Sequence, residues 1–513
     1  MRGGSPILKL ALFATGLSGI VAEYILSTLA TYFLGDSAVQ WSLIVSVMLF
    51  SMGLGSRLSK FIEDSLLLKF IGIEFLLSLL VSFSSLSAYT VAGFSDYAGL
   101  YIYSLSILIG VLIGLEIPLV IRLNEKFESL KVNIASVLEK DYWGSLAGGL
   151  FFAFVGLPYL GLTYTPFILG AINLAVALVL FFSVRKELAT RQKNLVSLSG
   201  AGLIAILVLG VFLAKPVILY GEQARYKDKV IYASQSRYQR VVITQWKNHY
   251  WLYLNGNQQL STLDEEKYHE PLVHPAMLSA RQHSEVLVLG GGDGCAVREV
   301  LKHPRLRKVD LVDLDSSVTN LARRHPVLTE LNQGAFADER VKIFHEDGFN
   351  FLERSERLYD VIIVDLPDPR SVELNRLYSQ EFYQLCFQAL RPGGVLVTQA
   401  GSPYFATKAF LCIEKTMAEA GFQTAKLHNQ IITLGQWGWV LGQKSADSLG
   451  LHSRLQNLPF EGLSTRFVDK EAMQMMSAFG KDITEYPVEK IEINRIQNPV
   501  LYRYYLDGNW DLY

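Results

Sequence analysis

Five aspartates in the second half of the chain follow short apolar runs of strand-like composition. They are Asp293, Asp313, Asp347, Asp365 and Asp368. In a wound parallel sheet the carboxyl ends of the strands line one crevice, which is the usual ligand site of such sheets. A single aspartate in such a position is as readily a helix cap, but five together repel one another and raise one another's pKa. The pattern predicts a crevice that binds a cation.

A glycine-rich turn, LGGGDG at residues 289–294, joins one of these runs to a predicted helix at 295–302. Glycines such as Gly290 and Gly292 permit a tight turn and the close approach of a ligand, and the start of the helix offers free N–H groups. Alone, such a turn indicates only a strand-to-helix connection. Asp313 follows about twenty residues later, where a carboxylate can bind ribose hydroxyls. Together the turn and the aspartates favour a ligand site.

The elements that must position these residues are strands alternating with helices, a pattern that predicts a wound, mostly parallel sheet. The predicted strands are 285–289, 309–314, 341–344, 361–364 and 394–398. A helix at 405–420 precedes two β-type runs, 424–434 and 438–441, which we expect to pair as a hairpin on the sheet edge. This arrangement is typical of Rossmann-like, methyltransferase-like domains.

A small β-layer is expected before the main sheet. Period-two alternation indicates strands at 230–234, 240–245 and 250–255, and the Asn255-Gly256 pair predicts a turn. The predicted fold class is therefore an α/β Rossmann-like domain with a small N-terminal β-subdomain, preceded in the chain by a multi-pass α-helical membrane domain.

Four features of the second half resemble the spermidine synthase family of polyamine aminopropyltransferases: DEEKYHE at residues 264–270, the GGGDG turn, the strand ending at Asp313, and a D-x-x-D-P strand end at 365–369. The resemblance covers roughly residues 230–443, and the whole chain looks like the bacterial variety with an N-terminal multi-pass membrane domain. It implies transfer of an aminopropyl group from decarboxylated S-adenosylmethionine to an amine such as putrescine, which yields spermidine and methylthioadenosine. Decarboxylated S-adenosylmethionine would be a cosubstrate, and no bound cofactor is implied.

The resemblance also implies roles for individual residues. Asp365 would be the general base that accepts the proton of the amine, with help from the Tyr268 hydroxyl. Asp293 would hold the ammonium of the donor and repel ordinary S-adenosylmethionine, which bears a carboxylate nearby. His269 and Asp368 would contact the acceptor amine. The remaining family positions are the donor-binding Gln239, Gln259, Gly290, Gly292, Asp313, Asp347 and Gly348, and the acceptor-side Gln399.

Three departures from the family pattern concern the acceptor end. Leu366-Pro367 stands where the family has a small polar pair, residues 370–372 replace the usual Gly-Pro, and Ile432 stands where an acceptor-side tyrosine is expected. The identity of the amine therefore stays open. The run 378–383 is interpreted as a helix cap and core rather than as part of the site.

Composition excludes several classes of protein. Hydrophobic residues make up 50% of the chain and charged residues 19%, and the mean hydropathy is +0.25, which excludes disorder and collagen-like repeats. The net charge of −1 and the lack of a basic tract argue against nucleic acid as a partner. Cys295, Cys386 and Cys412 form no CxxC pair, so neither a zinc site nor a disulfide framework is indicated, and we expect no metal.

The first 218 residues hold only 26 of the 95 charged residues and contain seven stretches apolar and long enough to cross a bilayer. These stretches are approximately 7–33, 40–56, 70–92, 99–121, 143–160, 165–184 and 195–214. The first is too long for a cleaved signal peptide. Glycines within the stretches, such as Gly110 and Gly114, favour a compact helix bundle in the lipid bilayer.

All thirteen Lys and Arg residues up to position 193 fall in alternate connections between these stretches. This asymmetry predicts a multi-pass protein of the cell (inner) membrane with its N-terminus in the cytoplasm. Seven crossings would then place the soluble half outside, where its cosubstrate is not expected. Either the stretch 195–214 does not cross, or the enzyme half faces away from the cytoplasm, and the sequence leaves both open.

Three acidic residues, Glu23, Glu74 and Glu116, lie within the apolar stretches. An ionised carboxylate there costs several kcal/mol unless it is paired or hydrated. These residues could contact a cation or a polyamine, or they could be protonated or paired with neighbouring serines and tyrosines.

The predicted domains are a seven-helix transmembrane domain, a small β-subdomain, a Rossmann-like aminopropyltransferase domain and a C-terminal extension, at residues 1–218, 224–275, 276–445 and 446–513. Two other functions fit parts of the pattern: an S-adenosylmethionine-dependent methyltransferase, and a non-catalytic membrane sensor or transporter of polyamines. Asp293 counts against the first, and the pair of Asp365 and Tyr268 counts against the second. A homodimer is expected only by analogy with the soluble family.

Overall fold

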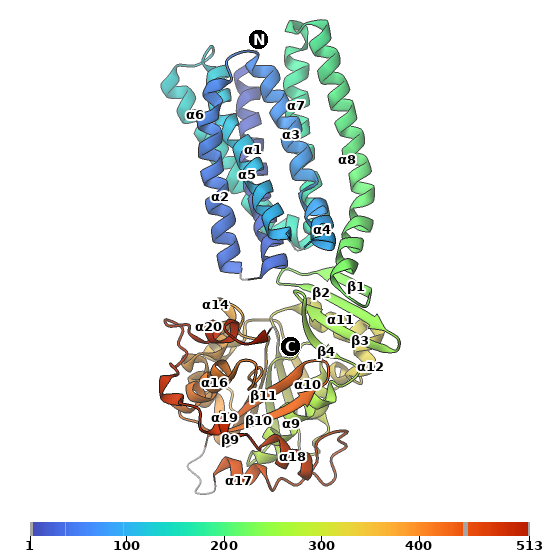
Figure 1. Ribbon diagram of the computed structural model, residues 1–513, viewed down its shortest axis with the longest axis vertical. Coiled ribbons are helices and arrows are strands. Elements are labelled where there is room, and N and C mark those ends of the chain that lie inside the picture. The colour runs from blue at the N-terminus through green and yellow to red at the C-terminus, as the bar shows by residue number, and fades with distance from the viewer. Residues whose placement is uncertain (1–3, 36, 96, 445–449, 511–513) are drawn as a thin grey trace. The chain divides into compact units, whose positions relative to one another are not determined.

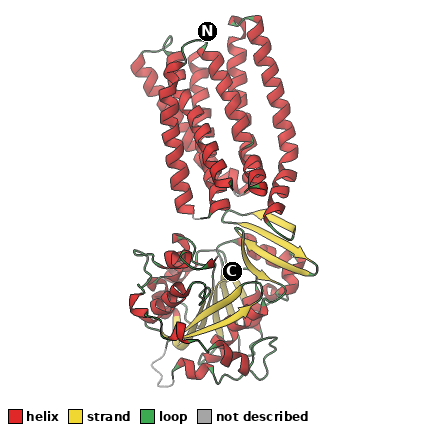
Figure 2. Ribbon diagram, viewed as in Figure 1, coloured by secondary structure: helices red, strands yellow, loops and turns green. Residues whose placement is uncertain are grey.

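The computed structural model describes residues 4–35, 37–95, 97–444 and 450–510. The chain folds into two compact units, residues 1–230 and 231–513. Figure 2 shows that the first unit is built of helices, whereas the second combines helices with strands. The predicted domain boundary at 445–446 lies outside the described residues.

The first unit is a bundle of long apolar helices, in which the backbone satisfies its own N–H and C=O groups. The helices are α1 (Gly4–Leu34), α2 (Ser37–Leu58), α3 (Leu66–Ser82), α4 (Ser84–Phe94), α5 (Ala98–Asn124), α6 (Leu130–Phe151), the π-helical η2 (Phe152–Leu160), α7 (Gly161–Val184) and α8 (Thr190–Arg225). Short 3₁₀ turns lie at Ser59–Phe61 and Arg185–Glu187. Helix α8 continues to Arg225, past the predicted end of the helical domain at residue 218.

The number of candidate membrane spans differs from the seven predicted. By length and composition, five helices of the described chain could cross a membrane, or up to six if α3 and α4, which are bent by 48° at their junction, form one span. The predicted segments 143–160 and 165–184 belong to one helical run, Leu130–Val184. This run is not straight, because Gly161 has a φ of +60° and a ψ of −171°, which interrupts helical geometry. The chain turns back there, because the Thr165 hydroxyl of α7 donates to the backbone oxygen of Gly156 in η2 at 2.9 Å. The segments 143–160 and 165–184 are therefore separate arms of this run, and seven crossings stay a prediction.

Close approach of helix backbones confirms the compact packing that the glycines predict. A Cβ atom on Gly114 of α5 would lie 2.0 Å from the carbonyl oxygen of Met52 on α2, and one on Gly144 of α6 would lie 2.0 Å from that of Phe13 on α1. Any larger side chain at these positions would push the helices apart. Glycine thus fixes the α2–α5 and α1–α6 contacts.

The second unit begins with a four-stranded sheet in the order β1-β2-β3-β4. Its strands are β1 (Lys229–Gln235), β2 (Arg240–Trp246), β3 (His249–Leu254) and β4 (Asn257–Ser261). The turn between β3 and β4 is the predicted one, with Asn255 and Gly256 both at positive φ. Strand β4 was not predicted, because its sequence NQQLS has a single apolar residue and no alternation.

The main sheet has seven strands in the order β10-β11-β9-β8-β5-β6-β7; Figure 1 labels the strands β9, β10 and β11 at one side of it. They are β5 (Glu285–Gly290), β6 (Lys308–Val312), β7 (Val341–Phe344), β8 (Tyr359–Asp365), β9 (Leu390–Gln399), β10 (Gln423–Ile431) and β11 (Gly435–Gln443). The first five strands pair in parallel, and β10 and β11 form an antiparallel hairpin that joins β9. The predicted wound sheet with a hairpin at its edge is confirmed.

Helices cover both faces of this sheet. The larger ones are α9 (Glu266–Ser279), α10 (Cys295–Leu301), α11 (Ser316–Arg324), α13 (Gly348–Arg354), α15 (Gln380–Ala389) and α16 (Thr407–Glu419), and the shorter ones are α12 (Pro326–Leu331), α14 (Val372–Asn375), α17 (Leu451–Leu455), α18 (Lys470–Met476), α19 (Lys481–Thr484) and α20 (Leu501–Leu506). The second unit has two hydrophobic clusters of buried residues, and the C-terminal residues belong to both of them: Met473 lies in one and Tyr505 in the other. They are part of the same compact unit as the sheet.

Candidate active site

The glycine-rich turn lies directly against the end of strand β8. Gly290 and Gly291 have positive φ, and a Cβ atom on Gly290 would lie 2.0 Å from the backbone oxygen of Asp365. The N–H of Gly291 donates to the same oxygen at 3.0 Å. A residue with a side chain at Gly290 would break this contact. The turn therefore holds the backbone of Asp365 at the rim of the sheet.

Asp365 and Tyr268 are in direct contact, as the sequence predicts for a base and its helper. The Tyr268 hydroxyl, from α9, donates to Oδ1 of Asp365 at 2.8 Å. Tyr268 is buried, and its ring packs at an angle to those of His269 and Trp439. A buried hydroxyl held in this way fixes the orientation of the carboxylate.

Asp293 and His269 complete a compact cluster around Asp365. One ligand-type atom from each of His269, Asp293 and Asp365 lies within 4.8 Å of the other two, and Nε2 of His269 is 3.9 Å from Oδ1 of Asp293. The other ring nitrogen of His269, Nδ1, donates to Oε2 of Glu265, the residue just before α9, at 2.7 Å. The structure thus brings the four predicted catalytic and amine-contacting residues together from α9, the turn and β8.

Burial and neighbouring charges shift both titrating groups of the cluster. Burial raises the pKa of Asp365 to about 6, with a further contribution from Asp293, while His269 and the Tyr268 hydrogen bond act in the opposite direction. Burial alone would lower the pKa of His269, but the hydrogen bond and charge of Glu265, with Asp293 and Asp365, outweigh it and raise this pKa to about 9. At neutral pH the cluster therefore contains an imidazolium and an ionised Asp365.

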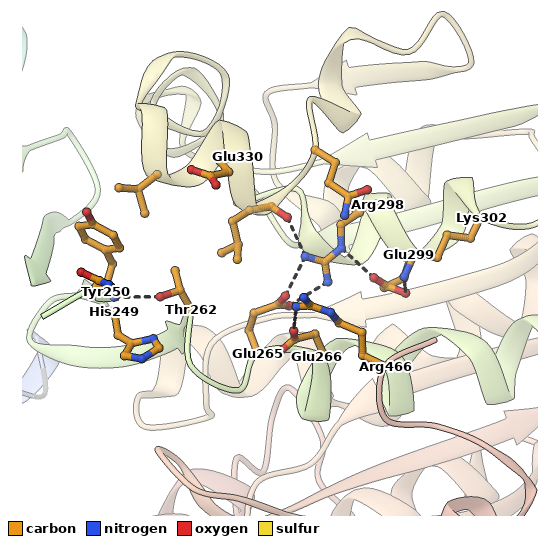
Figure 3. Close-up of a pocket in the computed structure, with 14 residues that line it drawn as sticks. His249, Tyr250, Thr262, Glu265, Glu266, Arg298, Glu299, Lys302, Glu330 and Arg466 are labelled. Carbon is orange, nitrogen blue, oxygen red and sulfur yellow. Dashed lines mark hydrogen bonds and ion pairs between the residues drawn. The ribbon is translucent and has the colours of Figure 1, made fainter. Parts of the chain in front are cut away.

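Behind His269 lies a buried ion-pair network that the sequence analysis missed. Arg298, from α10, donates to both oxygens of Glu265 at 2.7 and 3.0 Å and to Oε1 of Glu299 at 2.7 Å. Figure 3 shows Arg298 between these two carboxylates, at the wall of a cavity of about 450 Å³. The cavity is also lined by Tyr250, Thr262, Glu266, Lys302, Glu330 and Arg466. The sequence shows the charged residues of DEEKYHE and of the helix after the turn, but only the folded structure shows that they pair with one another.

The same network bears on metal binding. Within the described ranges, two sets of residues place three metal-ligand atoms close together: Glu265, His269 and Cys295, and His269, Asp293 and Asp365. Both oxygens of Glu265 are engaged by the Arg298 guanidinium, and the raised pKa of His269 keeps protons on the ring nitrogens that a metal would need. The donor set is that of an ion-pair network rather than of a metal centre.

Asp313 lies beside the glycine-rich turn on the predicted donor side. A Cβ atom on Gly292 would lie 2.5 Å from Oδ2 of Asp313, and Oδ1 accepts from the N–H of Asp315 at 2.8 Å. Burial, together with the charges of Asp315 and Asp293, raises the pKa of Asp313 to about 7. Gln239 reaches this region through Asp315, whose Oδ2 accepts from its Nε2 at 3.1 Å.

Three other predicted donor-side residues make local contacts. Asp347 caps helix α13 by accepting from the Asn350 N–H at 3.0 Å and also pairs with Arg376. Gly348 lies next to the end of β5, since a Cβ atom there would be 3.5 Å from Cδ2 of Leu289. The Gln259 amide donates to backbone oxygens of its own strand at 3.1 and 3.3 Å. A hydrogen bond thus ties Gln239 to Asp315 beside the crevice, whereas the hydrogen bonds of Gln259 stay within its own strand.

The predicted acceptor end lies around Asp368. Oδ2 of Asp368 accepts from the Tyr505 hydroxyl at 2.7 Å and from Nη2 of Arg370 at 3.3 Å, and Oδ1 accepts from Nε2 of Gln399 at 3.3 Å. Gln399 also donates to the backbone oxygen of Leu366 at 2.9 Å. The sequence predicts Asp368 and Gln399 here but not Tyr505, which comes from the C-terminal extension, or Arg370.

Two other sequence interpretations of this region can be compared with the structure. Ser379 caps α15 as expected, accepting from the Phe382 N–H at 3.2 Å. Tyr378 is buried but also has a role beyond the core, because its hydroxyl donates to the backbone oxygen of Pro367 at 2.9 Å and so supports the loop after β8. Ile432, at the position where a tyrosine was expected, is 66% exposed.

Comparison with known proteins assigns the chain to a family. The profile of the Spermine/spermidine synthase domain matches residues 265–451. The chain is 41% identical to polyamine aminopropyltransferase 2 of Aquifex aeolicus over 98% of both chains, and 38% identical to the polyamine aminopropyltransferase of Leptospira interrogans over 96% of both. A crystal structure of spermidine synthase in complex with the transition-state analogue AdoDATO is 27% identical, with 50% of this chain and 87% of that chain covered and a TM-score of 0.46. The chain belongs to the polyamine aminopropyltransferase (spermidine synthase) family and is an enzyme of that class.

Proposed function

We propose that Asp365 is the general base of an aminopropyl transfer from decarboxylated S-adenosylmethionine to a primary amine. The amine nitrogen forms a bond to the propyl carbon beside the sulfonium, the carbon–sulfur bond breaks, and methylthioadenosine leaves with the bonding electrons. The proton lost by the nitrogen passes to Asp365. The observation that carries this proposal is the cluster in which Tyr268 donates to Asp365 at 2.8 Å beside Asp293 and His269.

The chemistry requires a base and precise positioning more than activation of the leaving group. The thioether leaves as a neutral molecule, whereas the attacking amine has a pKa near 10 in water, like that of lysine, and must lose a proton. A buried carboxylate at hydrogen-bond distance removes this proton before the nitrogen attacks, because an ammonium has no free electron pair with which to form the new bond. Tyr268 keeps the second oxygen of Asp365 free to face the amine.

The donor is proposed to lie along the glycine-rich turn. Asp293 holds its ammonium and repels the carboxylate of ordinary S-adenosylmethionine, which gives specificity by repulsion. Asp313 binds the ribose hydroxyls. Asp347 and Gly348 contact the adenine, and Gln239 and Gln259 complete the donor side. The position of Asp313 against Gly292 supports this assignment, because it places the ribose acid and the turn on one wall.

The acceptor is proposed to be an alkyl diamine such as putrescine, with its distal ammonium at Asp368 and Gln399. The Asp368 carboxylate accepts hydrogen bonds from the Tyr505 hydroxyl and from Arg370, so Arg370 would compete with the amine for this carboxylate.

Purified protein incubated with decarboxylated S-adenosylmethionine should form methylthioadenosine faster with diamines than with monoamines of equal length. Asp368→Asn should raise KM about tenfold or more for diamines, since a charge-assisted hydrogen bond contributes about 1.5–3 kcal/mol, and should leave monoamines unaffected. Equal turnover of monoamines and diamines by the unmodified protein would exclude this acceptor class.

A fall in pH should inactivate the enzyme by protonating Asp365. The pKa of this carboxyl is about 6, so kcat/KM for methylthioadenosine formation should fall about tenfold per pH unit below that pH. In Tyr268→Phe the hydrogen bond that lowers this pKa is absent, so the acid limb should move to higher pH. Rate profiles of both proteins, with circular dichroism as the control for folding, provide the measurement. An acid limb that stays in place or moves down in Tyr268→Phe contradicts the proposed coupling.

The helical unit is proposed to cross the cell (inner) membrane several times and to contact lipid. Five or six helices of sufficient length and hydropathy support this proposal, as does the restriction of Lys and Arg to alternate connections. Protease treatment of sealed cells carrying a C-terminal tag tests it. A tag that is cleaved only after the cells are opened places the enzyme unit in the cytoplasm. A tag that is cleaved in intact cells places it outside. A homodimer remains a proposal by analogy.

A further inference from the structure

Four helices of the first unit surround a common axis. Helices α1, α3, α5 and α7, labelled in Figure 1, bring together the starts of α1 and α3 and the ends of α5 and α7. Residues from all four line a cavity of about 20 Å³ at this end, namely Ile7, Leu8, Leu67, Leu123, Leu180 and Val184. The four helices therefore form a ring with α1 and α3 antiparallel to α5 and α7.

Each helix of the ring contributes one buried polar residue at the same depth. Thr15 of α1, Glu74 of α3, Glu116 of α5 and Asn173 of α7 all lie about two to three helical turns from the ends that meet at the small cavity. Their exposed fractions are 3%, 0%, 0% and 1%. The Glu116 carboxyl acts electrostatically on Glu74, and Asp141 acts on Glu116. The Thr15 hydroxyl is the polar side-chain group that lies next to both carboxyls. We call these four residues the polar layer.

The polar layer has hydrogen-bonding atoms without partners. Across the described parts of the chain, both carboxyl oxygens of Glu74 and Glu116 and both amide atoms of Asn173 lack a hydrogen-bond partner. The Thr15 hydroxyl donates to the backbone oxygen of Ala11 at 3.1 Å. The pairing with serine or tyrosine that the sequence left open is therefore not formed by Glu74 or Glu116. Buried polar atoms of this kind are costly, and they mark a place that a ligand completes.

A comparison within the same unit shows that the missing partners are not a general property of its acids. Glu222 of α8 is equally buried, but its Oε1 accepts from the Tyr32 hydroxyl at 2.9 Å, and Arg225 stacks on the same tyrosine ring with its carbon 4.4 Å from the ring centroid. Glu222 thus lies within a formed network of aromatic and basic groups. The two acids of the polar layer have no such basic neighbour among the interactions described for them.

We propose that the polar layer is a cation-binding site of the helical unit and that it binds a protonated alkylamine. Two carboxylates on adjacent helices offer acceptors to an ammonium, which has only donors. The helix faces one turn away carry aliphatic residues, Leu12, Leu77 and Ile113, which suit the methylene chain of an amine. The choice of an amine over a metal ion rests on the proposed function, because the same chain acts on amines.

Amine stoichiometry on the full chain tests the proposal. Equilibrium dialysis of detergent-solubilised protein against radiolabelled putrescine, without the donor, counts the bound amine. The variant Glu74→Gln/Glu116→Gln should bind one amine fewer per chain than the unmodified protein, and its rate of methylthioadenosine formation should be unchanged. A chain without transferase activity would still show this loss, so failure of the proposed function and failure of this site are distinguishable.

The matched control is Glu23→Gln, which removes another buried carboxyl of α1 outside the polar layer and should leave the stoichiometry unchanged. Retained transferase activity shows that the double variant is folded, and Glu116→Asp, which keeps the charge, should retain the additional amine with weaker affinity. Equal stoichiometry in the unmodified protein and the double variant overturns the proposal. The proposal is also overturned if the double variant loses a bound metal ion instead of an amine, or if the carboxyl pair of the unmodified protein binds only protons.

Discussion

Asparagine in place of Asp365 should lower kcat/KM for methylthioadenosine formation about 1,000-fold, within the range of roughly 10²- to 10⁴-fold that a positioned general base contributes. The substitution keeps the size of the side chain and an oxygen that can accept from Tyr268, but the amide cannot take up a proton from the amine. Initial rates at saturating donor and varied amine give the comparison with the unmodified enzyme.

Donor binding provides the control for Asp365→Asn. Calorimetry with decarboxylated S-adenosylmethionine should give nearly the same affinity for the variant, because Asp293 and the glycine-rich turn are intact. A rate loss of less than about tenfold, with donor affinity preserved, would show that another group takes the proton. Asp293, the other carboxylate of the cluster, would then be the first candidate.

Replacement of Arg298 by glutamine should destabilise the enzyme unit by about 3–5 kcal/mol, the usual cost of leaving a buried charge without its partner. Glu265 and Glu299 are both buried and both accept from Arg298. A loss of this size corresponds to a fall in melting temperature of roughly 10 °C. The intrinsic fluorescence of the full chain during heating provides the measurement, because the tryptophans of β2, β3 and β11 all lie in this unit.

A surface ion pair of the same geometry is the matched control. Arg340 donates to both oxygens of Asp338 at 2.9 and 2.8 Å, but this pair is partly exposed to solvent. Arg340→Gln should therefore cost less than about 1 kcal/mol. Similar melting temperatures for Arg298→Gln and Arg340→Gln would mean that the buried network does not stabilise the fold.

The strands of the parallel sheet were predictable because each is a short apolar run that ends in a turn. Strand β8 (Tyr359–Asp365) is buried over nearly its whole length. The apolar run therefore marks the strand, and the acid that follows the run marks its carboxyl end, as in the neighbouring strands. The grouping of Asp293, Asp365 and Tyr268 also followed, since parallel topology places all carboxyl ends on one rim and the family block supplied the tyrosine. Local pattern and topology were sufficient for this part of the site.

What the sequence did not reveal depends on contacts between distant segments. Tyr505 is 137 residues from its partner Asp368, and Arg298 is 33 residues from Glu265. No periodicity or spacing links such residues, so their pairing emerges only when the chain is folded. Strand β4 was missed for a related reason: its polar sequence becomes a strand because β3 lies beside it.

The helical unit shows a third kind of difference. Hydropathy located every apolar segment, but it carries no information on whether neighbouring segments form separate helices. The run Leu130–Val184 contains the nine-residue π-helix η2 and turns back at Gly161, so that Thr165 of α7 contacts Gly156 of η2. The number of candidate spans therefore depends on local backbone geometry that hydropathy does not report.

The two halves of the active site are joined to the sheet in different ways. The donor turn and Asp365 share a backbone hydrogen bond and a glycine that tolerates no side chain, whereas Asp368 at the other end is held by side chains from separate segments, among them Tyr505 and Gln399. If Asp368 binds the acceptor amine as proposed, single substitutions among these side chains should change the preferred amine. The glycine-rich turn and Asp365 would be untouched by such substitutions, so the product could change while the transfer step stays the same.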